Sequence, residues 1–199
     1  MSLIKNNNEQ QEYLVLISPT RQVREAVKKV KDLFAEKFKA THPLESVAHI
    51  SVMNIIMDKN NENKLKEILK NFCKDQEVFN IFLSGYDGFR PHTIFIKVIE
   101  EKAITALHRR LKEAITPRLN LETWQIGTYS NPHMTVARNL TEDIYNKAIG
   151  EYRGRKFEQS FAADNLTLLW RKYMSGNKSH KWEGKQEFKF GQAQESLFG

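Results

Sequence analysis

Cysteine is nearly absent from this sequence of 199 residues, in which Cys73 stands alone. One thiol excludes an intrachain disulfide and a zinc site made of cysteine ligands. Long apolar runs are missing as well, so we expect no membrane-spanning helix, and the first residues lack the apolar core of a signal peptide. These absences together predict a cytoplasmic protein of a reducing compartment, with no membrane association.

Glycine-rich phosphate loops are also missing, because the sequence contains neither a P-loop nor a G-x-G-x-x-G fingerprint, and ATP-driven chemistry is not indicated. What is present is basic charge: 31 Lys and Arg stand against 24 Asp and Glu, a net charge of +7. This excess favours an anionic partner such as RNA, a nucleotide or a phosphate ester. Hydrophobic residues make up 40% of the chain, enough for the core of a single domain over residues 1–199.

Hydrophobic periodicity predicts strands and helices in alternation. In the first half the expected elements are a strand at 13–17, a helix at 21–39, a strand at 47–56, a helix at 62–74, and a strand at 79–86 closed by a turn at 85–88. In the second half they are a strand at 93–98, a helix at 101–115 ended by Pro117, a strand at 133–137, a helix at 142–152, a strand at 165–173, and a last strand at 181–190 after a turn at 175–180. Cys73 adjoins the apolar stripe of the helix at 62–74, so we expect it in the core and not as a nucleophile.

The two halves of the chain, about 12–90 and 91–190, repeat one order of elements: strand, helix, histidine-bearing strand, helix, strand. Residue identity between the halves is slight, so the repeat is one of pattern. It predicts two similar lobes packed into one unit. Residues 1–11 and 191–199 are expected to be loose tails.

Two tetrapeptides of the same pattern, histidine–any–Ser/Thr–apolar, occupy equivalent places in the two halves. The first begins at His49 and has Ser51 at its third position; the second begins at His133 and has Thr135 there. Residue frequencies give about 0.2 expected matches by chance in a chain of this length and about 0.03 for a pair. A single copy is a weak signal, whereas a matched pair in a repeated pattern is a strong one.

The spacing of these motifs has a physical meaning on a strand, where side chains alternate between two faces. His49 and Ser51 share one face, as do His133 and Thr135, while the apolar residues between them anchor each strand in a core. Two such strands brought together present two imidazoles and two hydroxyls to one cleft. Imidazoles, with an ordinary pKa near 6.5, can serve as base and acid, and hydroxyls can bind phosphate oxygens. The set favours phosphoryl transfer by acid–base catalysis, without a covalent intermediate.

Two other interpretations use the same residues. The histidines can be structural, half-buried residues of two strands. They can also be zinc ligands, but no carboxylate or further histidine stands at a ligand-like spacing beside His49 or His133. We therefore expect no metal and no cofactor.

The paired motifs, 84 residues apart, make the chain resemble the 2H phosphoesterase superfamily, and within it the bacterial 2′-5′ RNA ligase and 2′,3′-cyclic phosphodiesterase group. The resemblance covers about residues 13–190, and the run 132–138, Pro-His-Met-Thr-Val-Ala-Arg, is its most specific part. It implies an α+β fold of two pseudo-repeated lobes, each an antiparallel sheet with flanking helices, around a central cleft that carries both motifs. It also implies action on 2′,3′-cyclic phosphates or 2′-5′ linkages, generally without a metal.

By this resemblance His49, Ser51, His133 and Thr135 are the catalytic set, and Arg138 matches an arginine that often contacts substrate phosphate. The first motif has serine where threonine is commoner, but the hydroxyl remains. Strict alternation from His133 places Arg138 on the opposite face of its strand. It reaches the cleft only if the strand ends or bulges near residue 137.

Tyr129 precedes the second motif and is a candidate substrate-binding residue. It can stack on a base or sugar of the substrate, or it can pack on its own lobe. Of the two placements, packing on its own lobe is the commoner one for a loop tyrosine.

We expect a metal-independent phosphodiesterase that opens 2′,3′-cyclic phosphate ends of RNA or nucleotides by two-histidine catalysis, with 2′-5′ RNA ligation as a related activity. His133 is assigned as the base and His49 as the acid, although the near symmetry of the motifs leaves their order open. The rival is a non-catalytic module that binds RNA ends in the same cleft. No protein partner is implied, and a monomer is expected.

Overall fold

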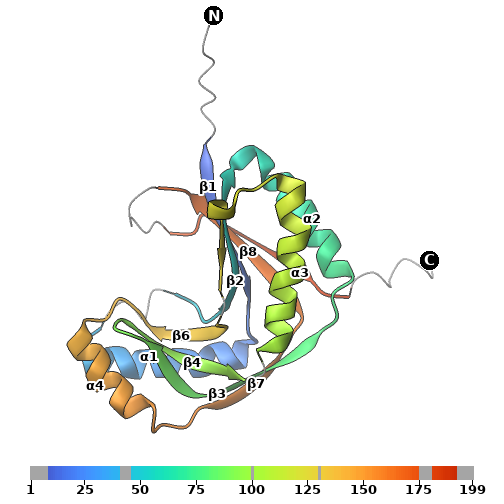
Figure 1. Cartoon of the computed structure of the whole chain (residues 1–199). Helices are drawn as coiled ribbons and strands as arrows, with labels where there is room; N and C mark the ends of the chain where they lie inside the picture. Colours follow the sequence, from blue (N-terminus) through green and yellow to red (C-terminus); the bar gives the residue numbers. More distant parts are fainter. Residues whose placement is uncertain (1–8, 41–45, 100, 130, 175–180, 192–199) are drawn as a thin grey trace, which may run out of the picture.

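The computed structural model describes residues 9–40, 46–99, 101–129, 131–174 and 181–191 (Figure 1). Within these ranges the strands are β1 (Gln10–Ile17), β2 (Ile50–Asp58), β3 (Phe79–Phe89), β4 (Thr93–Ile99), β5 (Ile126–Thr128), β6 (His133–Ala137), β7 (Glu158–Ala163), β8 (Asn165–Lys172) and β9 (Gly184–Lys189). The helices are α1 (Arg21–Phe38), α2 (Glu62–Lys74), α3 (Lys102–Leu119) and α4 (Glu142–Tyr152), with 3₁₀ turns η2 (Lys59–Asn61) and η3 (Thr123–Gln125).

The strands form one antiparallel sheet in the order β7-β3-β4-β6-β2-β1-β8-β9, with β5 beside β2. The predicted α+β class is therefore confirmed. A group made of β1, β2, β5, β8 and β9, called here the β2 part, meets a group made of β3, β4, β6 and β7, called the β6 part. Figure 1 shows the strands of the two parts running in clearly different directions. They are joined at β2 and β6 through the pair Ile50–Met134.

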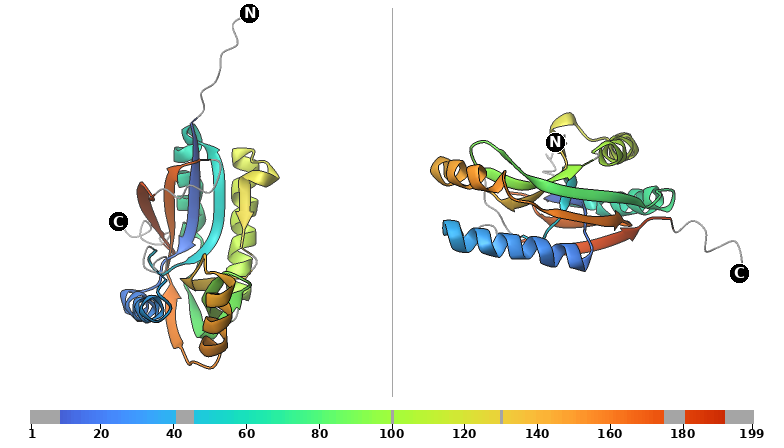
Figure 2. Two further views of the ribbon diagram at one scale, coloured as in Figure 1. Left: turned by 90° about the vertical axis from the view of Figure 1, so that its left-hand side faces the viewer. Right: turned by 90° about the horizontal axis from the view of Figure 1, so that it is seen from below.

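Amphipathic helices cover the two parts from different sides. Helix α3 packs on β2, and α2 packs on β8 and β9. Helix α1 packs on β6 and β7, whereas α4 packs on β3 and β4. Figure 2 shows α1 and α3 on opposite sides of the sheet. No helix of the described ranges is long and apolar enough to cross a membrane.

The expected division of the chain near residue 90 does not follow the strand pairing. Strand β3, from the first half, pairs with β4 and β7 of the second half. Strand β8, from the second half, pairs with β1. Hydrophobic patterning shows which face of a strand is buried, but it does not show which neighbour completes its hydrogen bonds. Each part of the sheet is therefore built from both halves of the sequence.

The turn expected at 85–88 is wrong, because β3 continues through it to Phe89. The register of β3 against β4 shifts between Leu83 and Tyr86, and Gly85 there has φ of +64°. Glycine permits this backbone geometry in a bulge as readily as in a turn. The chain reverses only after Phe89, before β4 begins.

The helix expected to end before Pro117 also runs further, to Leu119, which is buried. Proline in the last helical turn removes one backbone hydrogen bond, and burial of Leu119 on the stripe of Leu111 and Ile115 offsets that loss. Strands β5 and β7 were not expected from the sequence.

The expected tails need one correction, since Gln10 and Gln11 belong to β1 and Gln11 is buried. Residues 1–8 and 192–199 and the predicted turn at 175–180 lie outside the described residues. Cys73 is buried in the core as expected, and burial raises the pKa of its thiol to about 12.

Alanine substitutions at two glycines should have opposite effects on stability. A Cβ atom at Gly88 would lie 2.8 Å from the Thr93 carbonyl oxygen and from two atoms of the buried Tyr145 side chain. Gly88→Ala should therefore lower the free energy of unfolding by about 1–3 kcal/mol. Gly150 lies in α4, and a Cβ atom there would have nothing within 4 Å. Gly150→Ala should therefore raise the free energy of unfolding by about 0.5–1 kcal/mol. Urea unfolding of both variants checks the pair, and equal effects would contradict the crowding at Gly88.

Candidate active site

The two histidine motifs meet where the two parts of the sheet join. Ile50 pairs with Met134 in an antiparallel register. Each of these buried residues directly follows a motif histidine, so the register brings His49 opposite Thr135 and His133 opposite Ser51. Opposed residues in such a pair have Cα atoms about 4.5–5.5 Å apart and side chains on one face. The join thus gathers both imidazoles and both hydroxyls.

A bulge in β6 decides where Arg138 lies. Phe95 pairs with Thr135 and Ile94 pairs with Ala137, which leaves Val136 as an extra residue in β6. Val136 and Ala137 are both fully buried, so the alternation of faces shifts by one residue there. The strand then ends, and Arg138 comes to the face of the motif. The strand therefore both bulges and ends near residue 137, which was the condition for Arg138 to reach the face of the motif. The charge of Arg138 is close enough to lower the pKa of His49.

The first motif has a matching bulge. Leu16 of β1 pairs with Ser51 and Val15 pairs with Met53, which leaves Val52 as the extra residue. Beyond it, Asn54 takes the position that Arg138 has in the second motif. The Oδ1 atom of Asn54 is buried and has no hydrogen-bond partner among the described residues.

Both imidazoles are oriented in the same way. Nδ1 of His49 lies 2.8 Å from the Val47 carbonyl oxygen, and Nδ1 of His133 lies 2.7 Å from the Asn131 carbonyl oxygen. A carbonyl oxygen can only accept, so each Nδ1 carries the proton in the neutral ring. Each Nε2 is then left with a lone pair that can take up a proton from a reacting group.

The surroundings of His133 are aromatic. Its ring packs edge-on against Phe89, with centroids 4.9 Å apart, and at a tilt against Phe95, with centroids 5.0 Å apart. Burial lowers the pKa of His133, while the hydrogen bond to Asn131 opposes this effect. A groove of about 300 Å³ adjoins this wall; it is lined by Asp87, Gly88, Phe89, Phe95, Lys97, Val98, Glu101, Asn131 and Pro132.

The surroundings of His49 are positively charged. Burial lowers the pKa of His49, and the charges of Lys31, Arg138 and His133 lower it further, against the hydrogen bond to Val47. The two imidazoles are therefore not equivalent, although their motifs are nearly symmetric. Protonation of His49 brings another positive charge into a group of cations.

Lys31 of α1 was not among the site residues expected from the sequence. Its ammonium is buried and donates to the Ser46 carbonyl oxygen at 2.7 Å and to the Ser46 hydroxyl at 3.2 Å. Burial, and secondarily the charge of Arg138, lower the pKa of Lys31 to about 8. The signal was present in the sequence: Lys31 stands four residues after Val27 and three before Phe34, on the buried stripe of its helix.

Tyr129 lies beside the first motif. A hydrogen bond joins the hydroxyls of Ser51 and Tyr129, and the charges of Glu12, Arg138 and Arg171 act on Tyr129. Burial raises the pKa of Tyr129 above its ordinary value. The candidate residues named from the sequence are thus brought together around the join between β2 and β6.

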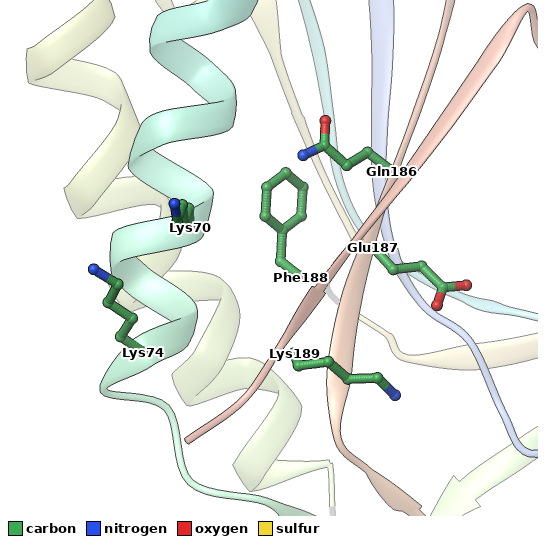
Figure 3. Close-up of a pocket in the computed structure, with 6 residues that line it drawn as sticks. All are labelled: Lys70, Lys74, Gln186, Glu187, Phe188 and Lys189. Atoms are coloured by element: carbon green, nitrogen blue, oxygen red, sulfur yellow. The ribbon is translucent and has the colours of Figure 1, made fainter. Parts of the chain in front are cut away.

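A second hollow lies elsewhere, between α2 and β9 (Figure 3). It is lined by Lys70, Lys74, Gln186, Glu187, Phe188 and Lys189. Strand β9 is at the edge of the sheet, separated from the motifs by β8 and β1. Glu187 is paired with Lys185, and Lys189 with Asp164. Among the described residues, no three His, Cys, Asp or Glu side chains gather as a metal site.

Comparison with known proteins connects this geometry to a family. A family model described as the 2′-5′ RNA ligase superfamily matches residues 19–173. A protein of Oceanobacillus iheyensis, named as a candidate phosphoesterase, is 22% identical over 182 residues, which are 90% of this chain and 98% of that protein.

Solved structures share the fold. LigT of Escherichia coli in its apo form matches with a TM-score of 0.62 at 14% identity, over 91% of this chain and 99% of that one. A protein of Thermus thermophilus matches with a TM-score of 0.63 at 14% identity, over 90% of this chain and 98% of that one.

The lowered pKa values of His49 and His133 predict how stability depends on pH. A histidine whose pKa is lowered in the folded state binds fewer protons than in the unfolded state as the pH falls below about 7. Stability is therefore lost between about pH 7 and the folded pKa values. In urea unfolding at pH 7.5 and 5.5, the double variant His49→Gln/His133→Gln should lose less stability than the wild type. His92→Gln, at an exposed histidine outside the site, is the control, and an equal loss in the double variant would contradict the prediction.

Proposed function

The chain belongs to the 2′-5′ RNA ligase superfamily, and we propose that it is a metal-independent phosphodiesterase that opens 2′,3′-cyclic phosphate ends of RNA or nucleotides. Joining of 2′-5′ linkages is the related reaction in the same site. One observation supports the proposal: the register of the Ile50–Met134 pair sets the two motifs side by side, and each motif histidine is hydrogen-bonded through Nδ1, which leaves a lone pair on Nε2.

The phosphate is held by groups that donate hydrogen bonds or carry positive charge. Ser51 and Thr135 lie diagonally across the join, each opposite the histidine of the other motif, and their hydroxyls donate to non-bridging oxygens. Arg138, brought to this face by the β6 bulge, adds a cation. Such donors stabilise the charge that builds on the phosphate in the transition state.

In hydrolysis, Nε2 of one imidazole takes a proton from water as the water oxygen bonds to phosphorus. The bond from phosphorus to one ribose oxygen breaks, and the protonated Nε2 of the other imidazole gives its proton to that oxygen. The product is a phosphate monoester beside a free ribose hydroxyl. The reaction needs no covalent enzyme intermediate, and no proton is lost or gained overall by the pair of rings.

The order expected from the sequence, His133 as base and His49 as acid, imposes an electrostatic condition. In the free protein the cations near His49 disfavour its protonated form. A bound phosphate anion offsets these charges and allows His49 to hold the proton that the acid must donate. His133, in its aromatic surroundings, then stays neutral and acts as the base.

Ligands of a structural relative support a nucleotide substrate. LigT of Escherichia coli has been solved in complex with 3′-AMP and, separately, with phosphate. A phosphate monoester on a ribose is the class of product that the proposed reaction releases. The rival, a module that binds RNA ends without catalysis, would use the same cleft and show no turnover.

Removal of either histidine predicts a large loss of rate. His49→Ala and His133→Ala should each lower kcat for a 2′,3′-cyclic nucleotide by about 10²–10⁴, because each removes an acid–base group. His92→Ala is the matched control and should retain the wild-type rate. Turnover by both motif variants near the wild-type rate would overturn the mechanism, and absence of turnover in the wild type on several cyclic nucleotides would favour the binding module. Treatment with EDTA should leave the wild-type rate unchanged.

Removal of the Thr135 hydroxyl should lower kcat more than it raises KM. Thr135→Val keeps the β-branched shape that suits the strand and removes only the donor. Because the phosphate gains charge in the transition state, the variant should lose about 2–4 kcal/mol of transition-state stabilisation, seen mainly in kcat. Steady-state kinetics on a cyclic mononucleotide measures this split. An unchanged kcat with a raised KM would instead assign Thr135 to ground-state binding.

A further inference from the structure

Lys31 is a buried charged group that the proposed reaction does not use. Its side chain is 4% exposed, whereas Lys28 and Lys29 of the same helix are exposed. Its ammonium donates to the carbonyl and hydroxyl oxygens of Ser46. Among the described residues, no carboxylate is paired with it. Burial of a lysine without an anionic partner is costly, so its position calls for a physical explanation.

The contacts of Lys31 lead directly to His49. Ser46, which Lys31 holds through two atoms, is three residues before His49. The next residue, Val47, supplies the carbonyl oxygen that orients the imidazole. Helix α1 therefore fixes the segment 46–49, and with it the direction of Nε2 of His49.

Two cations lie near His49, and the imidazole of His133 adds a third positive charge only when it is protonated. Lys31 approaches from α1, His133 from β6, and Arg138 from the residue after β6. Lys31 and Arg138 also repel one another. Lys31 is buried and Arg138 is exposed, and an anion that binds beside His49 would gain from the positive charge of both.

We propose that Lys31 is a positioning residue for His49: it anchors the segment 46–49 and keeps a buried positive charge beside the imidazole, so that His49 takes up its proton when a phosphate anion enters. The proposal rests on the proposed function for the identity of the anion as a phosphate. It assigns Lys31 an effect on the protonation of His49, and not a contact with the reacting atoms.

The test is a proton NMR titration of the His49 imidazole, which needs no substrate and no turnover. The resonance is assigned by its loss in His49→Gln. Lys31→Met keeps the length of the side chain and removes its charge, and it should raise the pKa of His49, increasing its proton affinity about three- to thirtyfold. Lys31→Arg should restore the wild-type titration. Lys29→Met, at an exposed site of the same helix, is the matched control and should leave it unchanged.

Lys31→Gln separates anchoring from charge, because an amide can still donate to Ser46 but is neutral. It should raise the pKa of His49 as Lys31→Met does. A His49 titration that is unchanged in folded Lys31→Met and Lys31→Gln would overturn the proposal and leave Lys31 a purely structural residue. This outcome does not depend on whether the protein turns over a cyclic phosphate.

Two measurements on the wild type keep the proposal testable if the neutral variants do not fold. Titration of ¹³C-labelled lysine should show one side chain, absent in Lys31→Arg, with a pKa of about 8. Addition of inorganic phosphate at pH 7 should then shift His49 toward its protonated form. A Lys31 that titrates with the exposed lysines, or a His49 that does not respond to bound phosphate, would each contradict the proposal.

Discussion

The pairing of Ile50 with Met134 is the interaction on which the site depends. It joins two groups of strands that have separate helices and different strand directions, and both of its side chains are fully buried. A shift of the register between β2 and β6 by one residue would turn the imidazole of one strand toward the core, on the opposite face from the other imidazole. Burial of Ile50 and Met134 thus holds the two histidine motifs against each other through packing.

Much of this site could be predicted from the sequence because it follows the two-residue period of a strand. The rule places His133 and Thr135 correctly, and the bounds of β6 agree with those expected. The rule fails for Arg138, because a bulge depends on how two strands pair. The hydrophobic pattern of a single strand does not show where its partner skips a residue. The same bulge geometry beside Ser51 shows that this departure belongs to both motifs.

The electrostatics of the site could not be predicted in this way. Lys31 is 18 residues before His49 in the chain, and only the packing of α1 on β6 brings it close. The two motifs look interchangeable as sequence, yet His133 lies against two phenylalanines and His49 lies among cations. Near symmetry of the backbone therefore coexists with a difference in the chemical surroundings of the two histidines.

Strands from each half of the chain pair with strands from the other half, and this pairing has a consequence for folding. Strand β1 is completed by β8, so that Gln11 pairs with Lys172 and Leu16 with Thr167. Neither half of the chain holds all the partners that its own strands need, and the β2 part cannot close until residues near both ends have met. Such contacts between distant residues slow folding, because the entropy of a long loop must be lost before they form. The domain should accordingly fold as one cooperative unit, late in synthesis, when β8 and β9 have left the ribosome.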